Sequence, residues 1–227
     1  MEFKPIAIED KYRINGYLRK YPPNISDLTF TNLFAWQKSK RLEYAEHEGH
    51  LMIRFNGDRY LQPVGPDPAG MIRKIGGRFE RVDLGIAMNT GLPYEPDPAH
   101  DDYLYSMVDM AELAGDKYRA KRNFVNRIAT LKPDVCELTA PSVYEFLELN
   151  KQWCKLRDCH SNEELSAEYV AVTIVLENFD KLGVSGVFVR IDGKPEAFAI
   201  GEPLNHDTYV EHFEVAGQIK GSARFML

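Results

Sequence analysis

Residues 184–215 read VSGVFVRIDGKPEAFAIGEPLNHDTYVEHFEV. Three runs in this stretch have the β-branched and aromatic composition that is typical of strands: 184–191, 196–204 and 208–215. Asp192-Gly193 is a strong hairpin signal between the first two runs, and residues 205–207 form the next turn. The stretch therefore predicts three consecutive strands joined by short turns.

One strand and two helices are predicted before these three strands. Residues 135–139 are a strand candidate, and Pro141 suits the first turn of a helix that runs to about residue 156. Ser161-x-x-Glu164 is a capping box that opens a second helix, and Gly183 suits the position just after that helix ends. The second half of the chain is thus predicted to run strand, helix, helix and three strands.

The first half repeats this order. Residues 3–8 alternate like a strand, and two helices are predicted over 9–20 and 28–39, the second with Asp27 as its N-cap. Three strand candidates then follow: 42–47, 51–55 and 59–64. We interpret the chain as an α/β fold of two tandem units, residues 1–133 and 134–227. The alternative is two unrelated α/β pieces.

The connecting region is less regular. Residues 65–100 are rich in Gly and Pro, and we place there only a helix near 69–75 and a strand near 79–84. Residues 102–107 are predicted to form a strand. The capping box Asp109-x-x-Glu112 then predicts a helix to about residue 131.

The composition is that of a soluble globular protein. Of the 227 residues, 44% are hydrophobic and 27% are charged. No apolar stretch approaches the ~20 residues of a membrane span, and the N-terminus lacks the apolar segment of a signal peptide. Cys136, Cys154 and Cys159 are an odd number without metal-ligand spacing. We therefore expect a cytoplasmic protein with reduced thiols and no metal site.

The net charge of −6 conceals one basic segment, residues 117–132. This segment contains six basic residues and no acid, so it carries +6 and the rest of the chain −12 (22 − 34). The basic residues are Lys117, Arg119, Lys121, Arg122, Arg127 and Lys132. Such a segment predicts one anionic ligand at one place, and the alternative is a solvated helix face.

Residues 218–223 follow the third strand of the second unit and read Gln-Ile-Lys-Gly-Ser-Ala. They fit Q/R-x-x-G-x-G/A, the pyrophosphate loop of the GNAT acyltransferases, whose backbone N–H groups approach phosphate oxygens. The candidate cofactor-binding residues are Gln218, Lys220, Gly221, Ser222 and Ala223. The alternative is an ordinary glycine turn into a helix.

Longer strings carry a more specific resemblance. DYLY at 102–105, LAGDKYRAKRN at 113–123, YVEHFE at 209–214 and IKG at 219–221 resemble bacterial phosphatidylglycerol lysyltransferases and their stand-alone relatives. The resemblance implies two tandem GNAT-like units that move an aminoacyl group from charged tRNA to a lipid hydroxyl. It implies aminoacyl-tRNA as the donor, charged tRNA as a partner, a small-molecule or lipid acceptor, and no tightly bound cofactor. The loop at residues 218–223 indicates acyl-CoA as the alternative donor.

The sequence also departs from that family. Family members continue past the loop through a helix, a strand and a charged string, whereas this sequence ends at Leu227. We therefore expect the second unit to be incomplete at its C-terminus, and the sequence to be an inactive part of a longer protein. The N-terminal membrane domain of the lysyltransferases is not found in this sequence either.

Several residues are candidates for the site. Lys121 falls in the apolar phase of its helix, so it either snorkels or points into a cleft. With Lys117, Arg122 and Asn123 it is a candidate for binding a phosphate or carboxylate. His212 and Glu214 share a strand face and are the candidate catalytic residues, because an acylated amine must lose a proton. The alternatives are a surface ion pair for Arg122 and a structural pair for His212 and Glu214.

Two weaker signals have structural interpretations. His47-x-x-His50 flanks a predicted hairpin turn without a third ligand, and Cys154 with Cys159-His160 could suggest a nucleophile. Three functions remain open: an acyl- or aminoacyltransferase, an acetyl-CoA-dependent N-acetyltransferase, and a non-catalytic module that binds a nucleotide or RNA end.

Overall fold

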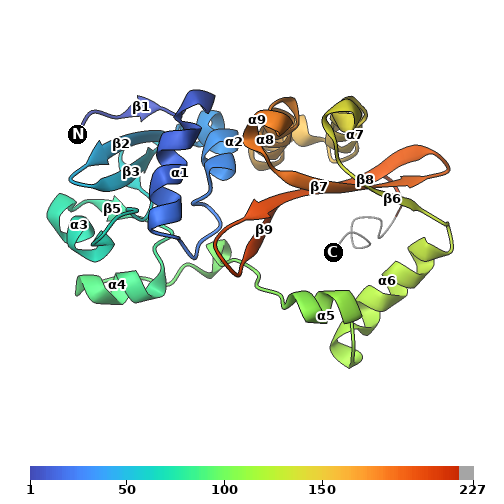
Figure 1. The fold of residues 1–227 in the computed structure, drawn as a ribbon, viewed down its shortest axis with the longest axis horizontal. Coiled ribbons are helices and arrows are strands. Elements are labelled where there is room, and N and C mark those ends of the chain that lie inside the picture. Colours follow the sequence, from blue (N-terminus) through green and yellow to red (C-terminus); the bar gives the residue numbers. More distant parts are fainter. Residues whose placement is uncertain (220–227) are drawn as a thin grey trace. The chain divides into compact units, whose positions relative to one another are not determined.

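The computed structural model describes residues 1–219 and contains two sheets flanked by helices (Figure 1). The chain divides into two compact units. The first unit comprises Met1–Asp102 and Pro203–Tyr209, and the second comprises Tyr103–Glu202 and the chain from Val210 onward. This division differs from the predicted boundary at 133/134, because the basic helix packs on the second sheet.

The first unit is built on a mixed sheet. Its strands lie in the order β1 (Lys4–Pro5), β2 (Glu43–His47), β3 (His50–Phe55), β4 (Arg59–Tyr60) and β5 (Arg78–Phe79). All neighbours are antiparallel except β4 and β5, which are parallel. Its helices are η1 (Ile8–Asp10), α1 (Lys11–Lys20), α2 (Phe30–Lys40), α3 (Pro68–Ile75), α4 (Leu84–Thr90) and η2 (Pro98–His100).

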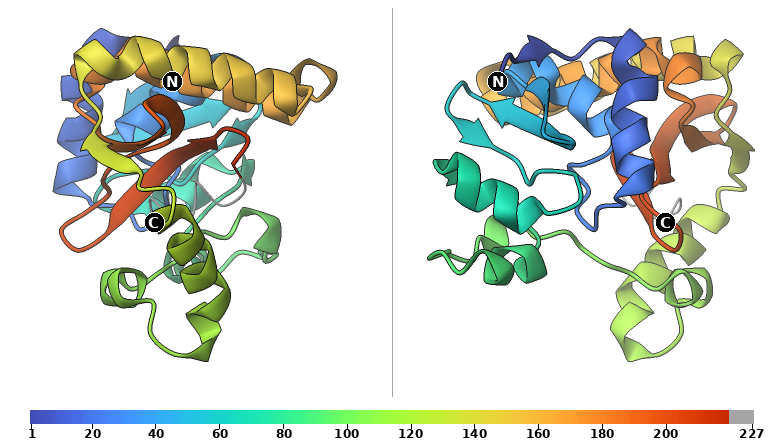
Figure 2. Two further views of the ribbon diagram at one scale, coloured as in Figure 1. Left: turned by 90° about the vertical axis from the view of Figure 1, so that its right-hand side faces the viewer. Right: turned by 60° about the vertical axis from the view of Figure 1, so that its left-hand side comes forward.

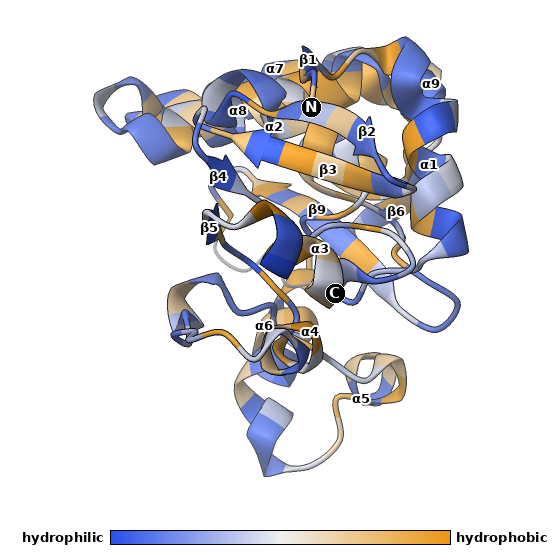
Figure 3. Cartoon of the chain, turned by 90° about the vertical axis from the view of Figure 1, so that its left-hand side faces the viewer, coloured by the Kyte–Doolittle hydropathy of each residue, from blue (hydrophilic) through white to orange (hydrophobic). Residues whose placement is uncertain are grey.

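The core of the first unit lies around β3, whose residues are nearly all buried. Leu51, Met52 and Ile53 are each 0% exposed, so both faces of the strand are covered. Figure 3 shows β3 as mostly hydrophobic and the short strand β4 as hydrophilic. The apolar residues 51–53 therefore lie in the central strand of this sheet.

The second unit has a four-stranded sheet. Its strands lie in the order β6 (Asp134–Glu137), β7 (Ser185–Ile191), β8 (Lys194–Pro203) and β9 (Tyr209–Ala216). Its longer helices are α5 (Met107–Glu112), α6 (Arg119–Ala129), α7 (Val143–Leu156), α8 (Glu163–Glu177) and α9 (Phe179–Leu182). Its described part, up to residue 219, also has three single turns: η3 (Asp116–Tyr118), η4 (Ala140–Ser142) and η5 (Cys159–Ser161).

Helices cover both faces of the second sheet (Figure 2). Phe188 and Phe198 are cross-strand partners, and both rings contact Phe146 of α7, with centroids 4.8 and 5.4 Å away. The next pair, Val189 and Ala197, lies on the opposite face and packs with Ile128 of α6. Since side chains alternate along a strand, this one register places one helix layer on each face.

The predicted α/β fold class is confirmed. Each unit runs through a strand, two helices and three strands, and all six strands predicted in the two triplets are present. The predicted helix near 69–75 is α3. Among the helices of residues 1–219, none has both the length and the apolar character that crossing a bilayer requires.

The segment from 102 to 131 differs from its prediction. No strand forms over 102–107, and the single helix predicted over 109–131 is two helices, α5 and α6. The break occurs at Leu113, which adopts φ 48°, and Gly115, with φ 79°. Glycine tolerates this conformation readily, so Gly115 favours a turn where the apolar periodicity predicted a continuous helix.

Three predicted caps are shifted by a few residues. The N-cap of α5 is Ser106, whose Oγ accepts the Asp109 N–H. Thr29 caps α2 and Asn162 caps α8, in place of Asp27 and Ser161. Several Ser, Thr, Asn and Asp residues near each helix start suit the cap, and the local backbone geometry selects among them.

The predicted strand over 79–84 is reduced to β5.

Two further predictions concern cysteine and histidine. Cys154 and Cys159 form a disulfide, which contradicts the prediction of reduced thiols, and Cys136 is free and exposed. His50 is buried, and its two ring nitrogens lie 3.0 Å from the Glu48 carbonyl and 3.1 Å from the Asp67 backbone N–H. These contacts give His50 a structural role in the first unit.

Candidate active site

The basic segment lies on η3 and α6 of the second unit, and its cations have separate partners. Lys117 Nζ is 2.7 Å from Asp109 of α5, and the Tyr118 hydroxyl donates to the same carboxylate at 3.0 Å. These hydrogen bonds lower the pKa of Asp109, and the Asp109 contact raises the pKa of Lys117. Lys117 therefore fastens the α5–α6 turn rather than facing a common anion with the other cations.

Arg122 is held by the backbone of the same turn. Its Nη1 donates to the carbonyl of Leu113 and, at 2.7 Å, to that of Gly115. The last carbonyls of a helix lack partners within the helix, so this guanidinium caps α5. The next residue, Asn123, is exposed. The structure thus places Arg122 at a structural contact that the local sequence pattern did not indicate.

Lys121 occupies a different position, between an aromatic ring and β9. Its Nζ lies 4.8 Å from the centroid of Tyr105, within the range of a cation–π contact. Its positive charge also offsets a small part of the rise in the pKa of Glu211 on β9. Lys121 lies on the apolar face of its helix, and this position directs its ammonium group toward the carboxylates of the second unit.

Two glutamates of β9 form the acidic part of the site. Glu211 is an exposed residue of β9, and the partial desolvation of its carboxyl group is the largest cause of its pKa shift. Burial, together with the adjacent Glu214 carboxylate, raises the pKa of Glu211 to about 7. A carboxyl group that titrates near neutrality can exchange a proton during a reaction. Sequence reasoning selected Glu214 but missed Glu211, because positions three apart on a regular strand face opposite sides.

His212 lies between these two glutamates along the chain. Its side chain is 0% exposed, and its Nε2 lies 2.9 Å from the Glu202 carboxylate at the end of β8. Within residues 1–219, the buried Nδ1 has no hydrogen-bond partner. If Nε2 carries the proton, Glu202 fixes the ring and the lone pair of Nδ1 is available as a base.

Glu202 is the second functional residue that sequence reasoning missed. The predicted turn at 205–207 brings the end of β8 beside the start of β9. The predicted turn alone could therefore have indicated that Glu202 lies close to β9. The diagonal contact to His212 depends on the twist and register of two long strands. In the structure the carboxylate that contacts His212 is that of Glu202, and the catalytic roles of His212 and Glu214 stay a prediction.

The start of the predicted phosphate loop is anchored to β8 by Glu196. The Gly217 N–H donates to the Glu196 carbonyl at 2.7 Å, and the Ile219 N–H donates to its carboxylate at 2.7 Å. Gln218, between these two residues, is exposed. The other predicted loop residues lie outside the described residues: Lys220, Gly221, Ser222 and Ala223.

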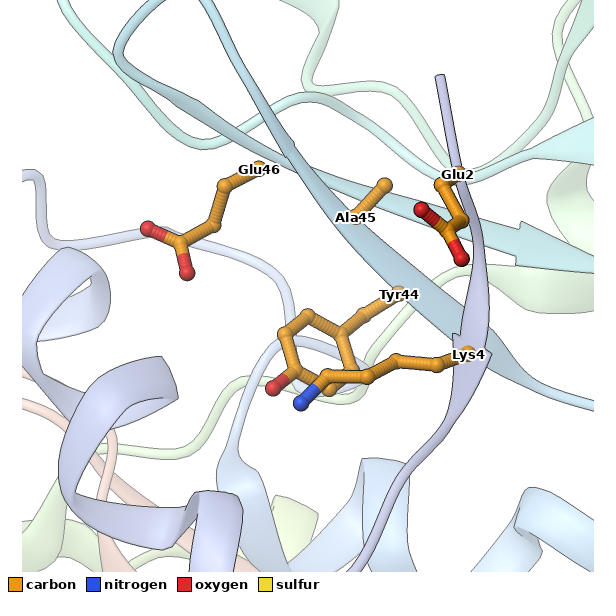
Figure 4. Close-up of a pocket in the computed structure, with 5 residues that line it drawn as sticks. All are labelled: Glu2, Lys4, Tyr44, Ala45 and Glu46. Atoms are coloured by element: carbon orange, nitrogen blue, oxygen red, sulfur yellow. The ribbon is translucent and has the colours of Figure 1, made fainter.

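A hollow of about 260 Å³ in the first unit is lined by Glu2, Lys4, Tyr44, Ala45 and Glu46 (Figure 4). Three of its polar side chains are paired within the unit. Lys4 Nζ and the Tyr44 hydroxyl reach Asp10 at 3.1 and 2.5 Å, and Glu46 accepts from Arg13 at 2.9 Å. This hollow contains none of the predicted site residues, so the candidate site remains the one on β9 and α6.

The raised pKa of Glu211 predicts a pH-dependent stability. Its ordinary value is 4.5 and its folded value is about 7, so the folded state binds the proton more tightly. This contribution to stability is complete below 4.5 and is lost as the pH rises through 7. Glu211→Gln should therefore become more stable relative to the wild type across that window, as measured by urea unfolding at several pH values. Glu137→Gln, at an exposed glutamate of β6, is the control. Parallel curves for Glu211→Gln and the wild type would contradict this prediction.

Comparisons with known proteins give matches that extend over all or nearly all of the chain. The family model described as "Phosphatidylglycerol lysyltransferase, C-terminal" matches residues 18–226. No curated protein matches the sequence. A crystal structure of a conserved protein of unknown function from Bacteroides thetaiotaomicron is 29% identical, with a TM-score of 0.88, over 100% of this chain and 84% of that one.

Two further structures share the fold at low identity. The C-terminal domain of a putative lysylphosphatidylglycerol synthetase from Agrobacterium fabrum has a TM-score of 0.53 at 14% identity, covering 96% of this chain and 72% of that one. The structure of L-PGS from Bacillus licheniformis has a TM-score of 0.53 at 12% identity, covering 95% and 72%. Because the family model extends over nearly all of the sequence, the chain belongs to the phosphatidylglycerol lysyltransferase C-terminal family.

Proposed function

We propose that this protein is an aminoacyltransferase of the GNAT-like type, with aminoacyl-tRNA as the donor and an amine or hydroxyl as the acceptor. The observation that carries the proposal is the buried His212, with Glu202 on one ring nitrogen and the other nitrogen unpartnered among residues 1–219. Family membership supports the aminoacyl class of donor.

The proposed chemistry is a direct transfer. The acceptor oxygen or nitrogen attacks the carbonyl carbon of the aminoacyl ester, and its proton passes to His212 Nδ1, directly or through one water. The bond between that carbon and the ribose oxygen then breaks, and His212 returns the proton to the ribose hydroxyl. Glu202 orients the ring and stabilises its protonated form.

The charged groups around β9 have separate parts in this proposal. The Glu211–Glu214 pair, with Glu211 titrating at about 7, is a second proton-exchange group beside His212. Lys121 supplies a positive charge next to these carboxylates and is the candidate contact for the phosphate of the tRNA end. Lys117 and Arg122 would act indirectly, by holding the turn from which α6 begins.

An acetyl-CoA-dependent N-acetyltransferase is the second candidate. Its support is the fit of residues 218–223 to the pyrophosphate-loop pattern, whose first residues are held to β8 by Glu196. The same base could serve an acyl-CoA donor, in which a thioester bond breaks instead of an ester bond. The nature of the donor therefore separates the two candidates.

The test is a binding screen of the full-length protein with lysyl-tRNA, uncharged tRNA and acetyl-CoA. We expect lysyl-tRNA to bind more tightly than uncharged tRNA, and acetyl-CoA not to bind. Lys121→Ala should weaken tRNA binding and reduce its salt slope by roughly one. Lys151→Ala is the matched control, because Lys151 is an exposed lysine on α7 that pairs with Glu148.

Two other outcomes would exclude the first proposal, and a third would exclude only the role of Lys121. Binding of acetyl-CoA alone would favour the acetyltransferase. Equal binding of charged and uncharged tRNA, without transfer of the aminoacyl group, would favour a non-catalytic RNA-end module. An unchanged salt slope in Lys121→Ala would remove Lys121 from the site.

A further inference from the structure

One group of three or more His, Cys, Asp and Glu side chains in residues 1–219 has the spacing to hold a metal ion: Cys154, Cys159 and His160. Their ligand atoms lie within 4.8 Å of one another. The distance from Cys154 Sγ to His160 Nε2 is 3.7 Å. All three residues belong to the second unit, and none contributes to the site on β9 and α6.

The backbone brings these residues together. Cys154 lies in the last turn of α7, and the chain reverses at Asp158, which adopts φ 48°, before η5 begins at Cys159. Backbone hydrogen bonds from Arg157 and Ser161 close the turn at 3.0 Å each. The Cα atoms of the two cysteines are 5.0 Å apart. The turn thus has hydrogen bonds of its own that keep the two cysteines close.

The three side chains differ in their exposure to solvent: the two cysteines are buried and the histidine is exposed. Cys154 and Cys159 are 2% and 0% exposed, whereas His160 lies at the surface. The His160 ring contacts Tyr169 of α8 edge-on, with centroids 6.3 Å apart, and this contact holds it over the sulfurs. An ion could therefore enter from the solvent side and be held by the buried sulfurs.

The donor set suits a zinc-like ion. Two thiolates and one imidazole are ligands of zinc in sites that leave a fourth position open. With Zn–S of ~2.3 Å and Zn–N of ~2.0 Å in a tetrahedron, sulfur and nitrogen lie about 3.5 Å apart. The 3.7 Å between Cys154 Sγ and His160 Nε2 agrees with this spacing. The two sulfurs are joined in the structure, so they must be reduced first.

We propose that the reduced form of this cluster binds one zinc ion, and that the zinc-bound dithiolate and the disulfide are alternative states of the same two sulfurs. A dithiol reductant supplies two electrons and two protons, which convert the disulfide into two thiols while the reductant becomes a disulfide. Zinc then displaces the two thiol protons into solvent, and neutral His160 binds it through Nε2. A disulfide oxidant reverses the process by removing two electrons and releasing the ion.

The test uses Co²⁺ as a spectroscopic substitute for zinc in the full chain. After reduction and removal of the reductant, we expect one equivalent of Co²⁺ to bind, with thiolate-to-metal charge-transfer absorption that added Zn²⁺ abolishes. The unreduced protein should bind none. His160→Ala should weaken binding by at least about 100-fold, the upper end of the loss seen for outer-shell partners. Because His160 is exposed, this variant should fold.

Cysteine variants separate this site from adventitious binding. Cys136→Ser is the matched control, since Cys136 is an exposed cysteine on β6, and it should bind Co²⁺ like the wild type. Cys154→Ser and Cys159→Ser should lose the charge-transfer band. The proposal is overturned if the reduced wild type binds no Co²⁺, if the unreduced protein binds equally well, or if Cys136→Ser alone abolishes binding.

Discussion

Replacement of His212 by glutamine is expected to lower the rate of aminoacyl transfer by about 100-fold or more, the range that general acid–base catalysis contributes. Glutamine can still donate a hydrogen bond to Glu202, so the partly buried carboxylate keeps a partner. It has no basic nitrogen to take up the acceptor proton. The measurement is kcat/KM of the full-length protein with the donor found in the binding screen.

Two companion variants sharpen this result. Glu202→Gln removes the charge that positions the ring, and we expect a loss of about tenfold, mainly in kcat with little change in KM. His206→Gln is the matched control, because His206 is a histidine with an 87% exposed side chain in the β8–β9 turn. Full activity in His212→Gln, with unfolding like that of the wild type, would refute the role of His212.

The largest expected effect on stability is at Gly65. A Cβ atom there would lie 2.2 Å from Cδ2 of His50, a distance that no relaxed contact permits. His50 cannot easily move, since it is 4% exposed and both of its ring nitrogens make hydrogen bonds. Gly65→Ala should therefore lower the free energy of unfolding of the first unit by about 3 kcal/mol, as overpacking of a filled core does.

Gly16→Ala is the control for this substitution. Gly16 lies within α1, and a Cβ atom there would have nothing within 4 Å. Alanine is the better helix former, so this variant should gain about 0.5 to 1 kcal/mol. Urea unfolding of both variants measures the difference. A Gly65→Ala protein as stable as the wild type would mean that His50 does not fill this space.

Much of the fold could be predicted from local pattern. The Asp192-Gly193 turn lies between β7 and β8, as predicted, and the composition of 184–191 predicted the strand that forms β7. These features depend on hydrogen bonds and steric preferences within a few residues. The break between α5 and α6 was missed, because the apolar periodicity continues through a turn that Gly115 and the Arg122 contacts stabilise.

The candidate site was only partly predictable. His212, Glu214 and Lys121 were selected by residue type and by their strings, and they lie in one unit. Their partners Glu202 and Glu211 were not selected. Desolvation of the Glu211 carboxyl and its closeness to Glu214 raise its pKa to about 7. Neither condition can be deduced from the positions of these residues in the sequence.

The sequence by itself determined the order of strands and helices, the tandem α/β repeat and the family, because short-range periodicity, turns and strings carry that information. Only the tertiary structure assigned residues 103–133 to the second unit and the hairpin tip, 203–209, to the first, where Asn205 Nδ2 donates to the Pro23 carbonyl at 3.3 Å. It alone joined Glu202 to His212 and brought His160 over the two cysteines. Such contacts depend on how twisted strands and packed helices close on one another, and local sequence does not specify that geometry.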